Sequence, residues 1–249
     1  MTWGPVFGWL HILTLVLAAG IIVGLYFLLK CMGEKLRFFT LFVLSFAGIV
    51  AIVYNLVKWG SPLQYLPLHM CSINAILLPI TVATRNKTLG NLLILWCVGA
   101  LMALLFTYGQ MNYEIFSMTF AIYYFPHILE FAIPIFLFAF KMIKLDWHCI
   151  LSTLLITIGI YTFVHLCNLG VNAYCLANNV LDWEGEVIRV NYMYSIEPSV
   201  APLPLFWSLI PYSYWYMYAV FPVIAVILLI VYLPSMIKGR RQNKKKKAK

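Results

Sequence analysis

Long apolar runs separated by short polar connections repeat along almost the whole chain. A helix that crosses the hydrocarbon core of a membrane needs about 20 apolar residues, and seven runs qualify. They cover residues 6–29, 38–57, 66–83, 92–108, 116–140, 147–169 and 209–233. This pattern predicts an all-α integral membrane protein, a seven-transmembrane helix bundle that forms a single domain over residues 1–237.

Positive charge gathers in every second connection between these runs. Lys and Arg follow the first, third, fifth and seventh runs, whereas the other connections hold most of the acidic residues. Cytoplasmic loops of membrane proteins are enriched in Lys and Arg, so we expect the N-terminus outside and the C-terminus in the cytoplasm. The longest connection, about residues 170–204, then lies outside. Its aromatic and apolar content predicts that it folds back over the bundle as a functional lid.

The composition supports a membrane protein and narrows its partners. The chain of 249 residues is 63% hydrophobic and only 10% charged, whereas soluble domains have roughly 25% charged residues. Eight of the last twelve residues, 238–249, are Lys or Arg. They predict a basic cytoplasmic tail that binds anionic lipid headgroups, and not nucleic acid. Because the chain has neither metal-binding Cys/His spacing nor a glycine-rich phosphate loop, we expect no metal and no soluble cofactor.

The third run carries polar groups where an apolar helix is expected. Residues 65–80 read YLPLHMCSINAILLPI and include His69, Cys71 and Asn74. Polar side chains in a membrane span are costly and suggest a functional site by default, and a cysteine near a histidine can act as a nucleophile. Residues two apart on a helix point in different directions, whereas residues three apart share a face. His69 is therefore expected to be a poor base for Cys71, while Asn74 shares its face.

Two later runs bring histidines to the same outer half of the predicted bundle. His127 lies in the fifth run, with Tyr124 and Glu130 each three residues away, and His165 lies three residues before Asn168 in the sixth. This arrangement predicts the cysteine of the third run as a nucleophile and His127 as its base. The alternative is structural, with small cysteines and hydrogen-bonded histidines that only pack the helices. Candidates for orienting the base or donating to an oxyanion are Asn74, Glu130, Tyr124, His165 and Asn168.

Four segments carry a resemblance to known families. The segment LPLHMCSINAILLP, residues 66–79, resembles the signature of the YwaF-like bacterial intramembrane proteins, and VNYMYSIEPSVAPL, residues 190–203, resembles their loop before the last helix. The segments IYYFPHILEFAIPIF and FVHLCNLGVN, residues 122–136 and 163–172, resemble segments of a vertebrate multi-pass phospholipid acyltransferase family. The resemblance implies three catalytic residues: Cys71, His127 and His165. Candidate substrate-binding residues, two from the loop motif and one from the aromatic cluster near residue 215, are Asn191, Tyr192 and Trp215.

Two functions of different classes fit these observations. The resemblance favours a cysteine-dependent lipid acyltransferase, in which Cys71 forms a thioester with an acyl group of a membrane phospholipid. The alternative is a small-solute transporter or a substrate-binding membrane module without covalent chemistry. We expect a bacterial plasma membrane location, with the site in the outer-leaflet half. The sequence leaves the acyl donor, the acceptor and the oligomeric state open.

Overall fold

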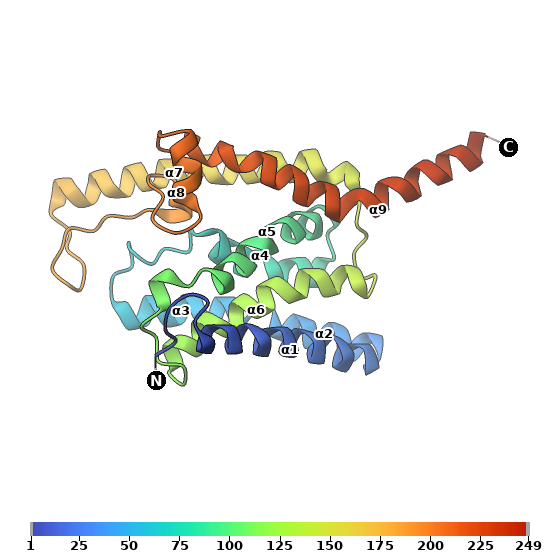
Figure 1. The fold of residues 1–249 in the computed structure, drawn as a ribbon, viewed down its shortest axis with the longest axis horizontal. Helices are drawn as coiled ribbons and strands as arrows, with labels where there is room; N and C mark the ends of the chain where they lie inside the picture. The colour runs from blue at the N-terminus through green and yellow to red at the C-terminus, as the bar shows by residue number, and fades with distance from the viewer. Residues whose placement is uncertain (1, 248–249) are drawn as a thin grey trace.

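The helices form three layers, with α4 and α5 in the middle (Figure 1). The computed structural model describes residues 2–247, and the side chains of the predicted basic tail, 238–249, lie outside the described part. In Figure 1, α7, α8 and α9 lie on one side of the middle layer, and α1, α2, α3 and α6 lie on the other. The α-helices are α1 (Trp9–Cys31), α2 (Glu34–Leu44), α3 (Ala47–Trp59), α4 (Met70–Thr84), α5 (Lys87–Leu105), α6 (Met118–Ala139), α7 (Ile150–Asn178), α8 (Leu203–Leu209) and α9 (Phe221–Lys247). The 3-10 helices are η1 (Tyr108–Gln110), η2 (Trp147–Cys149), η3 (Tyr192–Tyr194) and η4 (Trp215–Val220).

Six helical segments of the described chain are long and apolar enough to cross a membrane. They are Trp9–Cys31, Glu34–Trp59, Lys87–Leu105, Met118–Ala139, Trp147–Asn178 and Trp215–Leu233. The prediction of an all-helical membrane protein is thereby confirmed. The third predicted run forms α4, which has 15 residues and a length of about 22 Å, short of a hydrocarbon core of about 30 Å. The count of seven spans and the orientation stay predictions.

The helix α4 begins four residues later than the apolar run predicts. Pro67 has no backbone N–H, and a proline disfavours helical backbone at the residue before it. The chain stays irregular up to His69, the N-cap residue, which has extended backbone angles of φ −71° and ψ 152°. The hydroxyl of Tyr192 donates to the carbonyl of Leu63 in this irregular segment. The segment is thus held by the connection between α7 and α8 and by turn hydrogen bonds of its own, such as that from the N–H of Tyr65 to the Ser61 carbonyl.

The connection between α7 and α8 packs back onto α7. The predicted loop began near residue 170, but α7 continues to Asn178, so the irregular part is shorter. The side chain of Asn172 accepts the backbone N–H of Val190 at 2.7 Å and donates to its carbonyl at 2.9 Å. Asn168 makes the same paired contact with Tyr192, at 3.0 and 2.8 Å. Two asparagines one turn apart therefore fix the returning chain against α7.

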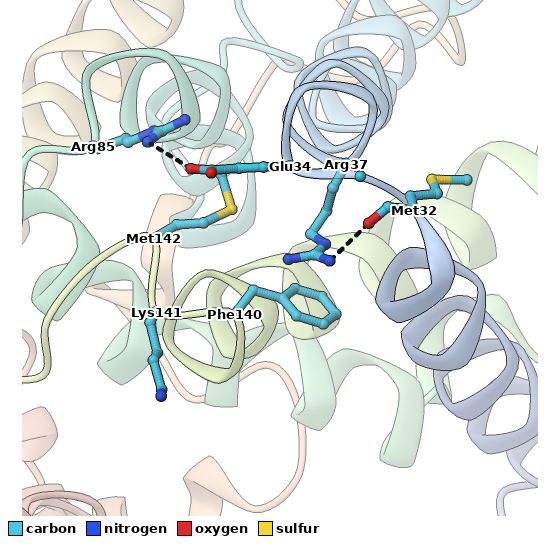
Figure 2. A pocket seen from close by; sticks show the side chains of 8 residues that line it. Met32, Glu34, Arg37, Arg85, Phe140, Lys141 and Met142 are labelled. Atoms are coloured by element: carbon cyan, nitrogen blue, oxygen red, sulfur yellow. Dashed lines mark hydrogen bonds and ion pairs between the residues drawn. The ribbon is translucent and has the colours of Figure 1, made fainter.

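Charged side chains lie close together where the start of α2 and the C-terminal ends of α4 and α6 meet the C-terminal end of α1 (Figure 2). Arg37 donates from Nε to the carbonyl of Leu29, near the end of α1, at 2.8 Å. Arg85, at the end of α4, lies 4.0 Å from the Glu34 carboxylate. These residues belong to the connections whose charge predicts the cytoplasmic side. The start of α4, with Cys71, lies at the opposite end of that helix.

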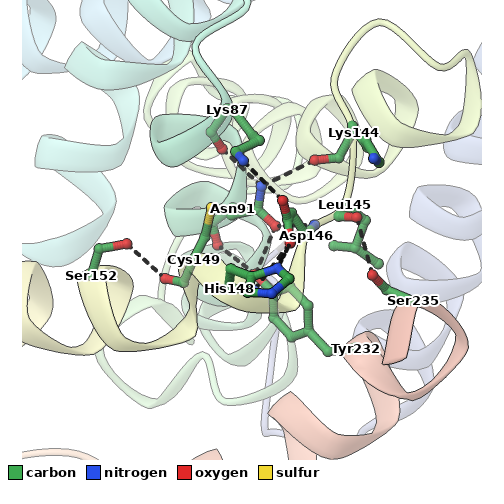
Figure 3. Close-up of polar contacts among 10 residues, drawn as sticks. All are labelled: Lys87, Asn91, Lys144, Leu145, Asp146, His148, Cys149, Ser152, Tyr232 and Ser235. Carbon is green, nitrogen blue, oxygen red and sulfur yellow. Dashed lines mark hydrogen bonds and ion pairs between the residues drawn. The ribbon is translucent and has the colours of Figure 1, made fainter. Parts of the chain in front are cut away.

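A second polar cluster joins α5, the connection after α6, and α9 (Figure 3). The amide of Asn91 is fully buried, accepts the hydroxyl of Tyr232 at 2.9 Å and accepts the backbone N–H of Asp146 at 3.1 Å. The Asp146 carboxylate also accepts from Lys87 at 2.8 Å and from His148 at 2.7 Å. The Lys87 and His148 donors hold the pKa of Asp146 below its usual range. This cluster fixes α9 against the middle layer.

Candidate functional site

A cavity of about 700 Å³ lies between the layers and meets the start of α4. Its volume falls within the range of about 300–1,000 Å³ that is usual for small-molecule sites. Walls come from α3, α4, α5, α6, α7 and α9, and from the loop around Met193. The residues that α6 contributes recur every three or four positions, as one face of a helix does: Thr119, Ile122, Tyr123, Pro126, His127 and Glu130. Cys71 and His127, the predicted nucleophile and base, therefore line the same cavity.

Cys71 occupies the second position of α4. The N-cap residue, His69, makes no side-chain capping bond, and the first helical bond of α4 runs from the N–H of Ile73 to the His69 carbonyl. The N–H groups of Met70, Cys71 and Ser72 therefore have no acceptor within the helix. Free N–H groups at the start of a helix favour negative charge. An oxyanion or a thiolate formed at Cys71 would lie among these donors.

The ring of His127 is held in one tautomer by its own helix. Its Nδ1 lies 2.6 Å from the backbone carbonyl oxygen of Tyr123, one turn earlier on α6. A carbonyl oxygen can only accept, so Nδ1 carries the proton and the neutral ring keeps a lone pair on Nε2. A histidine in this state can take a proton through Nε2. This is the state that the predicted role of base requires.

His69 also lines the cavity, in the opposite tautomer. The expectation that it points away from Cys71 assumed one regular helix through both residues, and that premise is wrong because α4 begins at Met70. Nδ1 of His69 accepts the backbone N–H of Met193 at 3.3 Å. The neutral ring therefore carries its proton on Nε2 and can donate there. The cavity holds one histidine suited to accept a proton and one suited to donate.

Glu130 and Asn74 lie side by side on α6 and α4 and are almost fully buried, with 4% and 1% of their surface exposed. Within the described chain, both polar atoms of the Asn74 side chain and one carboxyl oxygen of Glu130 lack a hydrogen-bond partner. Only a glycine fits beside them on α3, since a Cβ at Gly48 would lie 2.4 Å from the Ala75 Cβ and 2.7 Å from the Glu130 carboxyl. Glu130 lines the cavity with Cys71 and His127, whereas Asn74 lies behind its wall.

The structure does not bring every predicted site residue to this cavity. Tyr124 faces α1, where it is buried and donates to the Thr14 carbonyl. His165 lies 2.9 Å from the hydroxyl of Ser195, which also accepts from Asn168 at 2.8 Å. These contacts tie the returning connection to α7, outside the cavity wall. The roles predicted for Tyr124, His165 and Asn168 stay predictions.

The loop motif, residues 190–203, contributes to the cavity wall, but with residues other than the predicted ones. Asn191 accepts the N–H of Ile196 and donates to the Glu197 carbonyl, both at 2.9 Å, and so shapes its own loop. Tyr192 is buried, and Trp215 is exposed. None of the three predicted substrate-binding residues lines the cavity. The next two residues of the motif do, Met193 and Tyr194.

Tyr123, Ser72 and His69 also line the cavity, although Tyr123 and Ser72 were not among the predicted site residues and His69 was considered only as a poor base. Tyr123 was recoverable, because it lies four residues before His127 and shares its face. Ser72 and His69 depend on where α4 begins, and the only sequence signal for that start is Pro67.

Comparison with known protein families identifies a family that matches most of the chain. The model of the TMEM164 family matches residues 6–232. No curated protein and no solved structure gives a significant match. The family match covers the cavity and all its walls, and the resemblance to YwaF-like bacterial proteins stays a prediction.

Proposed function

The chain belongs to the TMEM164 family, a multi-pass membrane family linked to phospholipid acyltransferase activity, and from this premise we propose that it transfers acyl groups through a thioester on Cys71. The observation that carries the proposal is the cavity that Cys71 and His127 share, with Nε2 of His127 free to take a proton. Covalent catalysis by cysteine needs a nearby base of this kind.

The first half-reaction forms the thioester. Nε2 of His127 takes the thiol proton as Sγ of Cys71 attacks the carbonyl carbon of the phospholipid ester. The N–H groups of Cys71 and Ser72 donate to the resulting oxyanion. The bond from the carbonyl carbon to the glycerol oxygen then breaks, and the leaving oxygen takes the proton back from His127. The products are a lysophospholipid and the acylated Cys71.

The second half-reaction reverses these roles. A hydroxyl of an acceptor lysolipid gives its proton to Nε2 of His127 and attacks the thioester carbonyl. The carbon–sulfur bond breaks, and the Cys71 thiolate regains the proton. His69, whose Nε2 carries a proton in the neutral ring, is positioned to donate to a polar group of the substrate in either step.

The cavity walls suit a phospholipid. Apolar side chains of α5 and α9, such as Leu95, Met102 and Ile224, offer room for an acyl chain. Lys58, at the end of α3, donates to the hydroxyl of Thr119, which lines the cavity. The Lys58 ammonium has three donors, so it can hold a lipid phosphate beside that wall. We infer that Lys58 lies at the headgroup end of the site.

The reaction is proposed for the outer-leaflet half of the membrane. Cys71 and Lys58 lie at one end of the bundle, and the basic connections lie at the other, with Arg85 at the far end of α4. If the basic connections face the cytoplasm, the thiol meets esters of the outer leaflet. Intact vesicles of known orientation, given phospholipid in one leaflet only, distinguish the two leaflets.

Covalent capture tests the nucleophile. The purified protein in nanodiscs is incubated with a phospholipid that carries an alkyne-tagged acyl chain, and the protein is then examined for a tag that neutral hydroxylamine removes. The wild type should become labelled, and Cys71→Ala should not. Cys31→Ser, which changes an exposed cysteine at the other end of the bundle, is the matched control and should label normally. Equal labelling of Cys71→Ala and wild type would rule out the thioester at Cys71.

A further inference from the structure

A second cavity lies at the other end of α4 from Cys71. It has a volume of about 360 Å³ and is formed where the connection between α1 and α2 meets the ends of α4 and α6 (Figure 2). Its wall includes four charged residues, three basic and one acidic: Arg37, Arg85, Lys141 and Glu34. The two cavities share no lining residue. The length of α4 separates them by about 21 Å at 1.5 Å per residue.

The guanidinium of Arg37 is fixed before any ligand arrives. Nε donates to the Leu29 carbonyl and Nη2 donates to the Met32 carbonyl, both at 2.8 Å. The carbon of the guanidinium lies 4.5 Å from the centre of the Phe140 ring. These contacts leave the two N–H groups of Nη1 unused. A planar guanidinium with free donors is well suited to a phosphate oxygen.

Arg85 supplies the second positive charge, and its present partner is weak. It lies 5.1 Å above the Phe38 ring and 4.0 Å from the Glu34 carboxylate. The side chains of Arg85 and Glu34 are 41% and 81% exposed. Exposed pairs of this length contribute little free energy. Glu34 is therefore a loosely held anion that a stronger one can displace.

We propose that this cavity binds a phosphate group, with Arg37 and Arg85 as its ligands and Glu34 as the group that it displaces. The phosphate could belong to a lipid headgroup or to a soluble compound. The position at the ends of α1, α2, α4 and α6, at the edge of their apolar segments, favours a lipid headgroup. The charge balance agrees, because two guanidiniums, the Lys141 ammonium and one carboxylate leave a net positive charge of two on the cavity wall.

If Arg37 and Arg85 served only to set the orientation of the chain in the membrane, this geometry would not be required. The rule that places Lys and Arg in cytoplasmic loops depends on the number of charges and not on their arrangement. Lys35, on the same helix as Arg37, satisfies that rule with an exposed side chain outside the cavity wall. Arg37, in contrast, is fixed by two short hydrogen bonds and a ring. Lys35 therefore serves as the matched control.

Binding measurements on the detergent-purified full chain test the site. Three probes are titrated by thermophoresis: short-chain phosphatidic acid, short-chain phosphatidylcholine and inorganic phosphate. Phosphatidic acid should bind most tightly, and Arg85→Gln should weaken it about tenfold, the loss expected for one charge-assisted pair. Lys35→Gln should leave the affinity unchanged. Glu34→Gln should strengthen binding about threefold, because the competing anion is gone.

The outcomes separate the alternatives. Wild-type affinity in Arg85→Gln, or weaker binding in Glu34→Gln, overturns the site. Equal affinity for inorganic phosphate and phosphatidic acid overturns the lipid as the source. Arg37→Gln serves as a second variant, and its unfolding midpoint shows whether loss of the contacts to α1 has damaged the fold. Cys71→Ala should bind phosphatidic acid as the wild type does, so failure of the acyl-transfer proposal would leave this result unchanged.

Discussion

Nδ1 of His127 donates to the backbone carbonyl of Tyr123 at 2.6 Å, so the ring that we propose as the base is oriented by the helix that carries it. No second side chain is needed for this. The carbonyl fixes both the tautomer and the direction of the ring. Glu130, three residues after His127, lines the same cavity, and its predicted orienting role stays a prediction.

Replacing His127 should slow acylation of Cys71. His127→Ala removes the proton acceptor and is expected to lower the acylation rate by a factor of about 10²–10⁴, the usual contribution of a positioned base. Single-turnover labelling with the tagged phospholipid measures the rate. Tyr124→Phe, on the far side of α6, is the control and should react within about twofold of the wild type. An unchanged rate in His127→Ala would exclude the ring as the base.

Two substitutions of His69 should distinguish the roles of its two ring nitrogens, Nδ1 as an acceptor from Met193 and Nε2 as a donor in the cavity. His69→Asn keeps an acceptor near the Met193 N–H but has no donor in place of Nε2. The rate of acyl transfer should therefore fall about tenfold, while the unfolding midpoint stays near the wild-type value. His69→Gln keeps a donor near the position of Nε2 but loses the acceptor for the Met193 N–H. The unfolding midpoint should therefore fall more than the rate of acyl transfer. Thermal unfolding and multiple-turnover assays, measured on both variants, give the comparison. Equal losses in both variants would contradict the assignment.

Lys58→Gln should weaken the use of phospholipid without affecting the chemistry. The ammonium that donates to Thr119 is expected to hold the substrate phosphate, and its loss should raise KM about tenfold with little change in kcat. An uncharged acyl ester serves as the control substrate and should be used equally well by both proteins. A fall in kcat for the uncharged ester would instead indicate damage to the cavity.

Tyr192→Phe should destabilise the start of α4. The hydroxyl of Tyr192 donates to the Leu63 carbonyl in the irregular segment before the helix, and a buried carbonyl without a partner costs about 1–3 kcal/mol. The free energy of unfolding in detergent should fall by an amount in this range. Tyr212→Phe, at an exposed tyrosine, should leave it unchanged. Equal stability of the two variants would mean that water or another donor replaces the hydroxyl.

Acid should loosen the contact between α9 and the middle layer. The folded pKa of Asp146 lies below its unfolded value because Lys87 and His148 donate to its carboxylate. A lowered folded pKa adds stability above the unfolded pKa of about 3.9, and that stability is lost as the pH falls below it. Thermal unfolding between pH 6 and 3 should show the loss. Asp146→Asn should lower stability by about 1 kcal/mol at neutral pH and flatten this dependence. If the stability of Asp146→Asn falls with pH as steeply as that of the wild type, another group causes the pH dependence.

The apolar pattern predicted most of the helices because the rule behind it is local. A run of apolar residues forms a helix in a membrane since every backbone group must be paired within the segment. The start of α4 broke this rule, because Pro67 and the contact from Tyr192 replace helical bonds with bonds from a distant part of the chain. That contact joins residues far apart in sequence, so the periodicity of apolar residues does not predict it.

The candidate site was predictable where it depends on one helix face. Cys71, His127 and Glu130 follow from polar residues at helical spacing, and all three line the cavity. His165 and Asn168 also share a face, but that face binds the returning connection through Ser195. Spacing shows which residues lie on one face of a helix. It cannot show whether that face meets a cavity or another segment of the chain.

The shortness of α4 has a consequence for the lipid around the protein. A helix of 15 residues spans about 22 Å, so if α4 crosses an ordinary bilayer, the irregular segment before it would have to cover the remaining depth. In that arrangement Cys71 would lie below the headgroups rather than level with them. Hydrophobic mismatch would then determine how far an ester must descend to meet the thiol in the proposed reaction. Membranes of different thickness would thus present different reaction depths to the same unchanged protein.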